Sequence, residues 1–170
     1  MNRIAQFEKV SFNEFFNAWK NVFPNDNKDT IKDIYNSIKL PIRATKGSAG
    51  YDFFSPIPFN LSSNETILMP TGVRIKIEEG WFLGVFPKSG LGFKYRLQLD
   101  NTAGIIDSDY YYSDNEGHIF VKLTNDSKTN KILEIKASQS ICQGILLPFG
   151  ITYDDEATVI RNGGLGSTTK

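Results

Sequence analysis

Two stretches near the N-terminus repeat their apolar residues at the spacing of an α-helix. In "SFNEFFNAWKNVF", residues 11–23, four phenylalanines and a tryptophan fall on one face. Ser11 followed by Glu14 is the pattern of a capping box, and Pro24 predicts the end of the helix. A second helix is predicted in "NKDTIKDIYNSIKL", residues 27–40, with Asn27 as its N-cap. Residues 1–40 are therefore predicted to be an N-terminal helical extension, a hairpin joined by the polar loop "PNDN".

The aromatic face of this hairpin must pack against something, because so much apolar surface is unfavourable in water. The main expectation is a structural cap on the same domain or on a neighbouring subunit. The alternative is a docking surface for a regulatory protein, bound through residues 1–38.

The pattern changes at Pro41 to short runs in which apolar and polar residues alternate. In "VRIKI", residues 73–77, Arg74 and Lys76 face away from the apolar side chains, which predicts a half-buried antiparallel strand. "EEG", residues 78–80, predicts a hairpin turn after it. Further strands are predicted in "WFLGVFP", "HIFVKLTN", "KILEIKA", "QGILLPFG" and "ATVIRN". The expected fold is mainly β, a sandwich or barrel over residues 41–160, followed by a flexible Gly-rich tail, residues 161–170.

Composition and charge narrow the possible functions. The chain has 170 residues, enough for one domain with a core, and a formal net charge of zero. A balanced charge argues against a general nucleic-acid or membrane-surface binder, whose affinity depends on a basic field. Cys142 is the only cysteine, so an intramolecular disulfide is excluded, and no apolar run approaches the length of a membrane span. We expect a cytoplasmic protein.

Three stretches carry candidate chemistry for an anionic ligand. "FPKSGLGFK", residues 86–94, combines Lys88 and Ser89 with glycines that let backbone N–H groups turn toward a phosphate, although an ordinary polar turn would have the same composition. The tail "RNGGLGSTTK" has a similar composition and would form a lid if it ordered over a polyphosphate. Asp52, at a strand start, either caps a turn or helps to hold a hydrated cation.

The metal ligands of zinc sites are lacking, because His118 is the only histidine and Cys142 the only cysteine. Carboxylates, cations, amides and hydroxyls remain, and these suit Mg²⁺–phosphate chemistry. "NTAGIIDSDYY", residues 101–111, places Asp107 and Asp109 on an apolar, β-prone segment beside tyrosines.

Five of these stretches together resemble a known family. "SAGYD", "PKSGLG", "DNTAGIIDSDY", "ICQGIL" and "GGLGST" occur in this order and are similar to the five motifs of the trimeric all-β dUTPases. The resemblance runs from Pro41 to the C-terminus and is greatest to the bacterial and bacteriophage type. It implies a distorted jelly-roll or β-barrel and a homotrimer. It also implies the hydrolysis of dUTP to dUMP and pyrophosphate with Mg²⁺, which keeps uracil out of DNA.

By this resemblance, the third motif forms a β-hairpin that holds deoxyuridine. Tyr110 would pack under the deoxyribose and leave no room for a 2′-hydroxyl, and Asp107 would orient and deprotonate the attacking water. Asp109 is expected on the opposite face of an extended chain, in a structural role. The residues assigned to the nucleoside are Asn101, Gly104, Ile105, Ile106, Tyr110 and Phe120.

The other motifs would hold the triphosphate, with each site drawing motifs from all three subunits. Asp52 would bind Mg²⁺ through water. The residues assigned to the phosphates and to the closing tail are Lys88, Ser89, Gly90, Gln143, Arg161, Leu165, Gly166, Ser167 and Thr168.

Three features depart from the family's pattern. Lys88 stands where the family usually has arginine, so either the phosphates are held more weakly or another cation, such as Lys94 or Arg96, assists. Leu165 replaces a phenylalanine that stacks on uracil, and the spacing after Arg161 is one residue short. An insert, "YYSDNEGHIF", follows the third motif. Either one of its aromatic side chains covers the uracil instead, with Tyr111, Tyr112 and His118 as the candidates, or it is a polar loop.

Two other functions stay open at this point. One is dCTP deamination, because the dCTP deaminase family shares this fold and the trimer. An Asp in the water-activating position favours dUTP hydrolysis. The third possibility is a nucleotide-sensing interaction protein that uses the helical extension.

Overall fold

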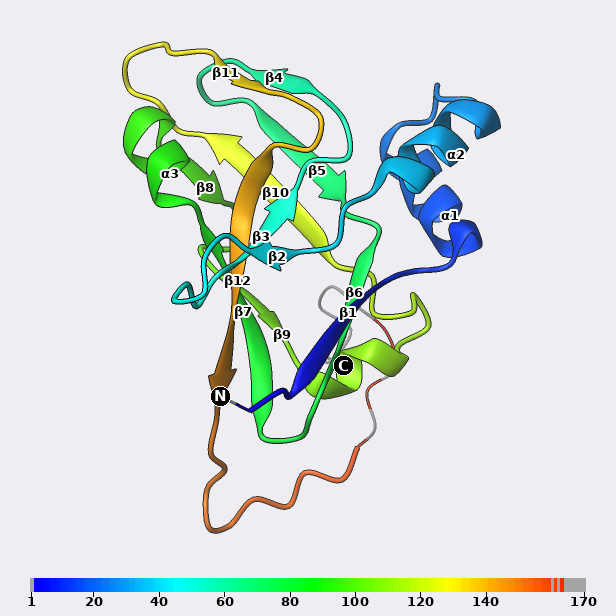
Figure 1. Cartoon of the computed structure of the whole chain (residues 1–170), viewed down its shortest axis with the longest axis vertical. Helices are drawn as coiled ribbons and strands as arrows, with labels where there is room; N and C mark the ends of the chain where they lie inside the picture. Colours follow the sequence, from blue (N-terminus) through cyan, green and yellow to red (C-terminus); the bar gives the residue numbers. More distant parts are fainter. Residues whose placement is uncertain (1, 160, 162, 164–170) are drawn as a thin grey trace.

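The strands of the molecule form antiparallel sheets, which carry most of its core (Figure 1). The computed structural model describes residues 2–159, 161 and 163. Its largest sheet has the order β2 (Ile42–Arg43), β3 (Tyr51–Phe54), β12 (Ser140–Pro148), β7 (Trp81–Pro87) and β9 (Gly104–Ile106). A second sheet joins β5 (Thr66–Pro70), β10 (Phe120–Asn125) and β8 (Leu97–Leu99). Two smaller sheets pair β1 (Ala5–Lys9) with β6 (Val73–Ile77), and β11 (Leu133–Ile135) with β4 (Phe59–Leu61). The expectation of a mainly β, distorted jelly-roll fold is confirmed.

The alternating pattern locates most of the strands. In β6, Val73, Ile75 and Ile77 are buried while Lys76 is exposed, as the sequence predicts. The predicted strands around β7, β10, β11 and β12 are also present. "ATVIRN" is an error, because its described residues, 157–159 and 161, lie in neither helix nor strand.

The predicted hairpin at "EEG" is wrong in its pairing. A turn does form there, with Gly80 at a φ of 81°. However, β6 pairs with β1, and β7 pairs with β12 and β9. The N-terminal strand β1, for which the sequence shows no clear pattern, aligns Phe7 with Ile75 and takes the place of the expected partner.

Both predicted helices form, as α1 (Phe12–Val22) and α2 (Lys28–Ser37). Ser11 and Asn27 cap them, since each side-chain oxygen accepts a hydrogen bond from a backbone N–H three residues later. The capping box is only half made, because the Glu14 carboxylate turns away from the N-terminus of α1 and contacts His118 instead. Among the residues that the structure describes, no helix is long and apolar enough to cross a bilayer.

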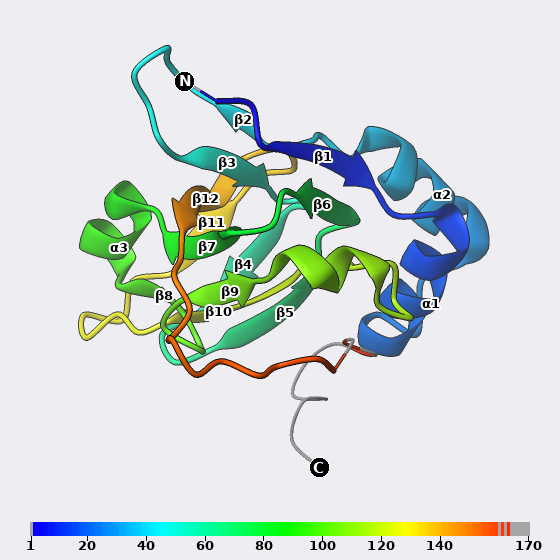
Figure 2. The same ribbon diagram turned by 90° about the horizontal axis from the view of Figure 1, so that it is seen from below.

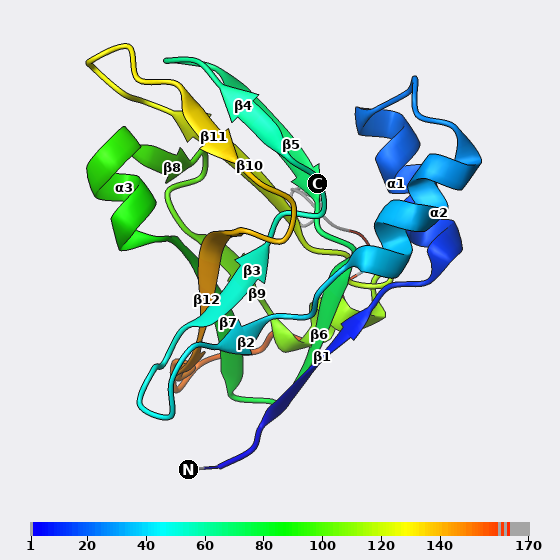
Figure 3. The ribbon, with the colours of Figure 1, turned by 45° about the horizontal axis from the view of Figure 1, so that its top comes forward.

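The aromatic face of the hairpin packs on the β domain. Phe15, Trp19 and Ile31 are fully buried and belong to the same core cluster as strand residues such as Met69 and Ile75. The aromatic stripe is therefore a structural cap within this chain and is not free to dock a partner, while a regulatory partner bound through other surfaces of residues 1–38 stays a prediction. Figures 2 and 3 show the two helices at one end of the molecule and α3 (Ser89–Tyr95) at the other.

Two short helices replace expected turns and extended chain. α3 occupies the predicted phosphate turn and ends at Arg96, whose φ of 51° is left-handed. The 3₁₀ helix η1 (Ser108–Tyr112) follows β9 directly and carries the tyrosines of the third motif. The β-hairpin expected in this motif is also wrong, because β8 pairs with β10 whereas β9 pairs with β7.

Candidate active site

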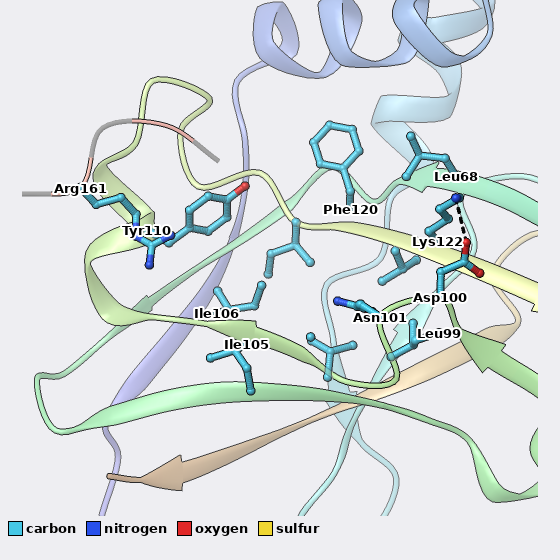
Figure 4. Close-up of a pocket in the computed structure, with 14 residues that line it drawn as sticks. Leu68, Leu99, Asp100, Asn101, Ile105, Ile106, Tyr110, Phe120, Lys122 and Arg161 are labelled. Atoms are coloured by element: carbon cyan, nitrogen blue, oxygen red, sulfur yellow. Dashed lines mark ion pairs between the residues drawn. The ribbon is translucent and has the colours of Figure 1, made fainter. Parts of the chain in front are cut away.

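A cavity of about 550 Å³ lies between the β5–β10–β8 sheet and the segment formed by β9 and η1. Its size falls in the range of about 300–1,000 Å³ that is usual for small-molecule sites. Figure 4 shows Tyr110 and Arg161 at one end of this pocket, the Asp100–Lys122 pair at the other, and Asn101 between them. The lining residues are Leu68, Val85, Leu99, Asp100, Asn101, Gly104, Ile105, Ile106, Tyr110, Ile119, Phe120, Val121, Lys122 and Arg161.

The loop between β8 and β9 brings Asn101 to the pocket. Gly104 lies opposite Val85 in the ladder, and a Cβ on Gly104 would come within 3.2 Å of the Val85 Cβ. A side chain at this position would therefore push the loop away from β7. Although this segment is not a hairpin, all six residues that the sequence assigns to the nucleoside line the pocket.

Tyr110 is held rigidly in the pocket wall. Its hydroxyl donates to the His118 carbonyl at 2.8 Å and accepts from the Asn115 side-chain amide, also at 2.8 Å. The side chain is buried, and this burial raises the pKa of the phenol, so the hydroxyl stays protonated as a donor. Because two hydrogen bonds fix its hydroxyl, this bulky ring limits the room for a bound sugar.

Arg161 joins the two acids of the third motif at the edge of the pocket. Its Nη2 lies 2.5 Å from an Asp107 oxygen and its Nε lies 3.0 Å from an Asp109 oxygen. Burial raises the pKa of Asp107; Arg161 opposes this shift and Asp109 adds to it. The expectation that Asp109 lies on the opposite face from Asp107 is wrong, because both acids contact one guanidinium at the start of η1. Residues two apart in an extended chain would also share a face.

The residues that the sequence assigns to the phosphates form a second cluster, away from Asp107 and Arg161. The Lys88 Nζ lies 2.9 Å from both oxygens of Asp52, and this pair is partly buried. Gln143 lies opposite Asp52 in the ladder and donates to the Pro87 carbonyl at 3.0 Å. Ser89 and Gly90 are exposed in the first turn of α3. Arg96 forms an ion pair with Asp126 at 3.1 Å, and assistance to Lys88 from Lys94 or Arg96 stays a prediction.

The acid cluster of Asp107, Asp109 and Arg161 and the phosphate cluster around Lys88 lie at opposite ends of β7. Ile106 lies opposite Leu83, which places Asp107 near Phe82, whereas Lys88 follows the last residue of the strand. At about 3.3 Å per residue, six residues of strand separate the clusters by roughly 20 Å. One triphosphate cannot contact both clusters of a single chain.

Among the described residues, no group of three or more histidine, cysteine or acidic side chains could hold a metal ion. Asp52, with Gln143 beside it, offers one carboxylate that already holds a cationic group. This donor set fits a magnesium ion whose remaining ligands are water and substrate oxygens, since Mg²⁺ keeps several waters and commonly uses one or two carboxylates.

The three aromatic candidates named in the insert, Tyr111, Tyr112 and His118, do not line the pocket. His118 is completely buried, and its ring nitrogens contact Gly72 and Glu14. Tyr112 is 70% exposed, and neither it nor Tyr111 lines the cavity. Phe120, at the end of the insert, is the aromatic residue that lines the pocket alongside Tyr110. The predictions for Leu165, Gly166, Ser167 and Thr168 lie outside the described residues.

Sequence reasoning missed one pair at the far end of the pocket. Lys122 and Asp100 form an ion pair at 2.8 Å. The signal is visible in "FVKLTN", where alternation places Lys122 on the same face as Phe120.

Comparison with known proteins agrees with this geometry. The sequence profile of the dUTPase family matches residues 36–169. The chain is 36% identical over 134 residues to the deoxyuridine 5′-triphosphate nucleotidohydrolase of Lactococcus lactis, covering 77% of this chain and 88% of the relative. It is 38% identical over 147 residues to that of Dictyoglomus turgidum, covering 81% and 95%.

Solved structures show the same architecture. The dUTPase from Streptococcus mutans superposes with a TM-score of 0.62 at 29% identity, over 86% of this chain and 97% of that one. The dUTPase from phage phi11 of S. aureus has the same fold, with a TM-score of 0.62 at 18% identity, over 91% and 96%. The order of the motifs, the pocket and these matches lead to one conclusion: the chain belongs to the dUTPase family.

Proposed function

We propose that the chain hydrolyses dUTP to dUMP and pyrophosphate. The observation that carries this proposal is the position of Asp107, which is held beside Arg161 at the edge of a nucleoside-sized pocket. The same short segment supplies Tyr110 to the pocket wall, so the reacting acid and the sugar-facing ring are fixed relative to each other.

The pocket accounts for recognition of the nucleoside. Asn101 and the backbone at Gly104 to Ile106 read the edge of the uracil, and Phe120 contributes an apolar aromatic surface. The Tyr110 ring lies against the deoxyribose and excludes a 2′-hydroxyl. Because its own hydroxyl is already bonded to His118 and Asn115, the ring has little freedom to move aside.

Asp107 acts as the general base for in-line attack on a phosphorus atom. A carboxylate is a weak base, so its contribution comes from placing the water and from a site closed to bulk solvent. In the free protein Arg161 forms ion pairs with both Asp107 and Asp109. A bound triphosphate competes for the guanidinium, which then stabilises phosphate charge and leaves Asp107 free to accept a proton.

A complete site needs more than one copy of the chain. Lys88, Ser89, Gly90 and Gln143 are the phosphate-binding residues, yet they lie roughly 20 Å along β7 from Asp107 by the rise of a strand. In a homotrimer, a neighbouring copy supplies this cluster to the triphosphate held beside Asp107, and the C-terminal tail closes the site.

Asp52 is the residue that would hold Mg²⁺, through water. A solved structure of a mutant phage phi11 dUTPase describes the coordination of a structural Mg(II) ion. Bound at Asp52, the ion would neutralise charge on the phosphate oxygens during transfer. Lys88, which pairs with Asp52 in the free protein, would then contact the phosphates directly.

Release of pyrophosphate from dUTP, measured beside dCTP, dTTP and UTP with and without Mg²⁺, tests this proposal. Of these four nucleotides, we expect only dUTP to release pyrophosphate rapidly, and Mg²⁺ should stimulate this release. Release of ammonia from dCTP, with dUTP left intact, would show a deaminase instead.

A further inference from the structure

The N-terminal extension contacts one wall of the nucleotide pocket at three points. This wall segment, residues 107–120, begins at Asp107, contains η1 with Tyr110, and ends at Phe120. Figure 2 shows the chain running from β9 through η1 toward α1. All three contacts come from residues 8–14, which lie before the part of the chain that the family profile matches.

The first contact is between Glu14 of α1 and His118. The backbone N–H of Gly72 donates to Nε2 of His118 at 2.8 Å, so Nε2 is the unprotonated nitrogen. The proton must then lie on Nδ1, which faces a Glu14 carboxylate oxygen at 3.1 Å. Burial lowers the pKa of His118 to about 4, so the imidazole is neutral at physiological pH. Glu14 therefore fixes the orientation of a neutral, fully buried ring.

His118 in turn contacts both aromatic residues of the pocket. Its carbonyl accepts the hydrogen bond of the Tyr110 hydroxyl at 2.8 Å. Its ring centroid lies 4.5 Å from that of Phe120, and 6.2 Å from that of Phe15 in α1. A displacement of His118 would thus reach both ring systems that face the nucleoside.

Two further contacts hold the same segment. The Glu116 carboxylate accepts hydrogen bonds from the Ser11 backbone N–H at 2.7 Å and from its hydroxyl at 2.6 Å. The Tyr111 hydroxyl donates to Glu8 of β1 at 2.8 Å, and Glu8 is paired with Arg74 at 3.0 Å. Ser11 already caps α1, and Glu14 could complete its own capping box. The N-terminus of α1 is thus capped without the contacts to the wall segment. The wall segment, in contrast, is held by all three of these contacts.

We propose that the N-terminal extension is a positioning element of the nucleotide site, and that Glu14 is a positioning residue that holds Tyr110 and Phe120 through His118. The effect falls on the choice of sugar, because a less firmly held Tyr110 ring leaves room for a 2′-hydroxyl. This inference rests on the proposed role of Tyr110.

The test compares Glu14→Ala with two controls in the full-length protein. Glu14→Gln keeps an acceptor for the His118 Nδ1 proton, and Asp33→Asn makes the same carboxylate-to-amide change at an exposed site on α2. The readout is the ratio of kcat/KM for dUTP to that for UTP. For Glu14→Ala we expect this ratio to fall by about tenfold, with kcat for dUTP reduced less than the ratio. Both controls should keep the wild-type ratio.

Other outcomes would decide against the inference. A Glu14→Ala protein that unfolds at a lower temperature but keeps the wild-type ratio would show that the extension only stabilises the fold. If Glu14→Ala does not fold, Glu116→Ala, which removes a partly exposed contact to Ser11, should lower the ratio in the same direction, and an unchanged ratio would overturn the proposal. A wild-type protein that hydrolyses dUTP and UTP equally would instead remove the proposed role of Tyr110.

Discussion

Arg161 controls how readily the Asp107 carboxylate takes up a proton in the free protein. Burial and the neighbouring Asp109 both raise the pKa of Asp107, whereas the Arg161 guanidinium opposes them. A general base works only when it is deprotonated, so the acid limb of kcat/KM follows its pKa in the free enzyme. The net shift is upward, and activity should be lost on acidification at a pH above the ordinary range of an aspartate.

Two substitutions should move this limb in opposite directions. Asp109→Asn removes a negative neighbour, lowers the pKa of Asp107 and moves the acid limb to lower pH. Arg161→Ala removes the positive neighbour and moves the limb to higher pH, in addition to weakening activity. The measurement is kcat/KM for dUTP against pH. Limbs that move together, or not at all, would show that another group controls this titration.

Tyr110 should determine rejection of the ribonucleotide. Tyr110→Ala opens space beside the sugar, and we expect the preference for dUTP over UTP to fall by about tenfold or more. Tyr112→Ala is the matched control, because Tyr112 is exposed and does not line the pocket. An equal change in both variants would indicate a general disturbance of η1 rather than contact with the sugar.

At the scale of elements, local pattern predicts which segments are helix or strand but not which strands pair. The caps of α1 and α2 and the alternation in β6 depend on neighbours within a few residues, and these predictions are confirmed. Pairing depends on residues far along the chain. β6 pairs with β1, and β8 pairs with β10. The predicted β6–β7 and β8–β9 hairpins are therefore wrong, although the chain turns at both places.

The site follows the same rule. The motifs identify Asn101 and Tyr110, which line the pocket, and Asp107, which pairs with Arg161 at its edge. The sequence could not show that Asp109 shares Arg161, because this contact depends on a 3₁₀ turn and on a residue 52 positions away. For the same reason it missed the contact between Glu14 and His118, which joins elements 104 positions apart.

The packing of α1 on the wall segment should make stability depend on pH. The folded-state pKa of His118 is about 4, below its ordinary value of 6.5. The unfolded chain therefore binds the proton more readily, and stability is lost as pH falls from about 6.5 toward 4. The loss is on the order of 3 kcal/mol, partly offset by Glu14, whose pKa is raised by burial and by Glu116.

Nuclear magnetic resonance can follow this group directly, because His118 is the only histidine in the chain. In the native protein its imidazole resonance should stay that of the neutral ring down to about pH 5. The free energy of unfolding should fall over the same acid range. A native titration near pH 6.5 would contradict the buried, neutral imidazole.

At the scale of the whole molecule, the proposed function together with the separation of the two clusters along β7 predicts that chains share sites. A protein with Asp107→Asn keeps an intact phosphate cluster, and one with Lys88→Ala keeps an intact acid. Each should be nearly inactive alone. In randomly mixed oligomers, about one quarter of the sites would combine an intact half from each chain, so co-expression should restore about a quarter of wild-type activity. Mixtures that stay inactive would place both halves of the site on one chain.

The central claim is that Asp107 activates the attacking water without being needed to hold the nucleotide. The most direct measurement pairs the turnover of Asp107→Asn on dUTP with its affinity for a non-hydrolysable dUTP analogue. We expect kcat to fall by about a thousandfold or more, with the dissociation constant within about threefold of wild type. Turnover within tenfold of wild type would contradict the account.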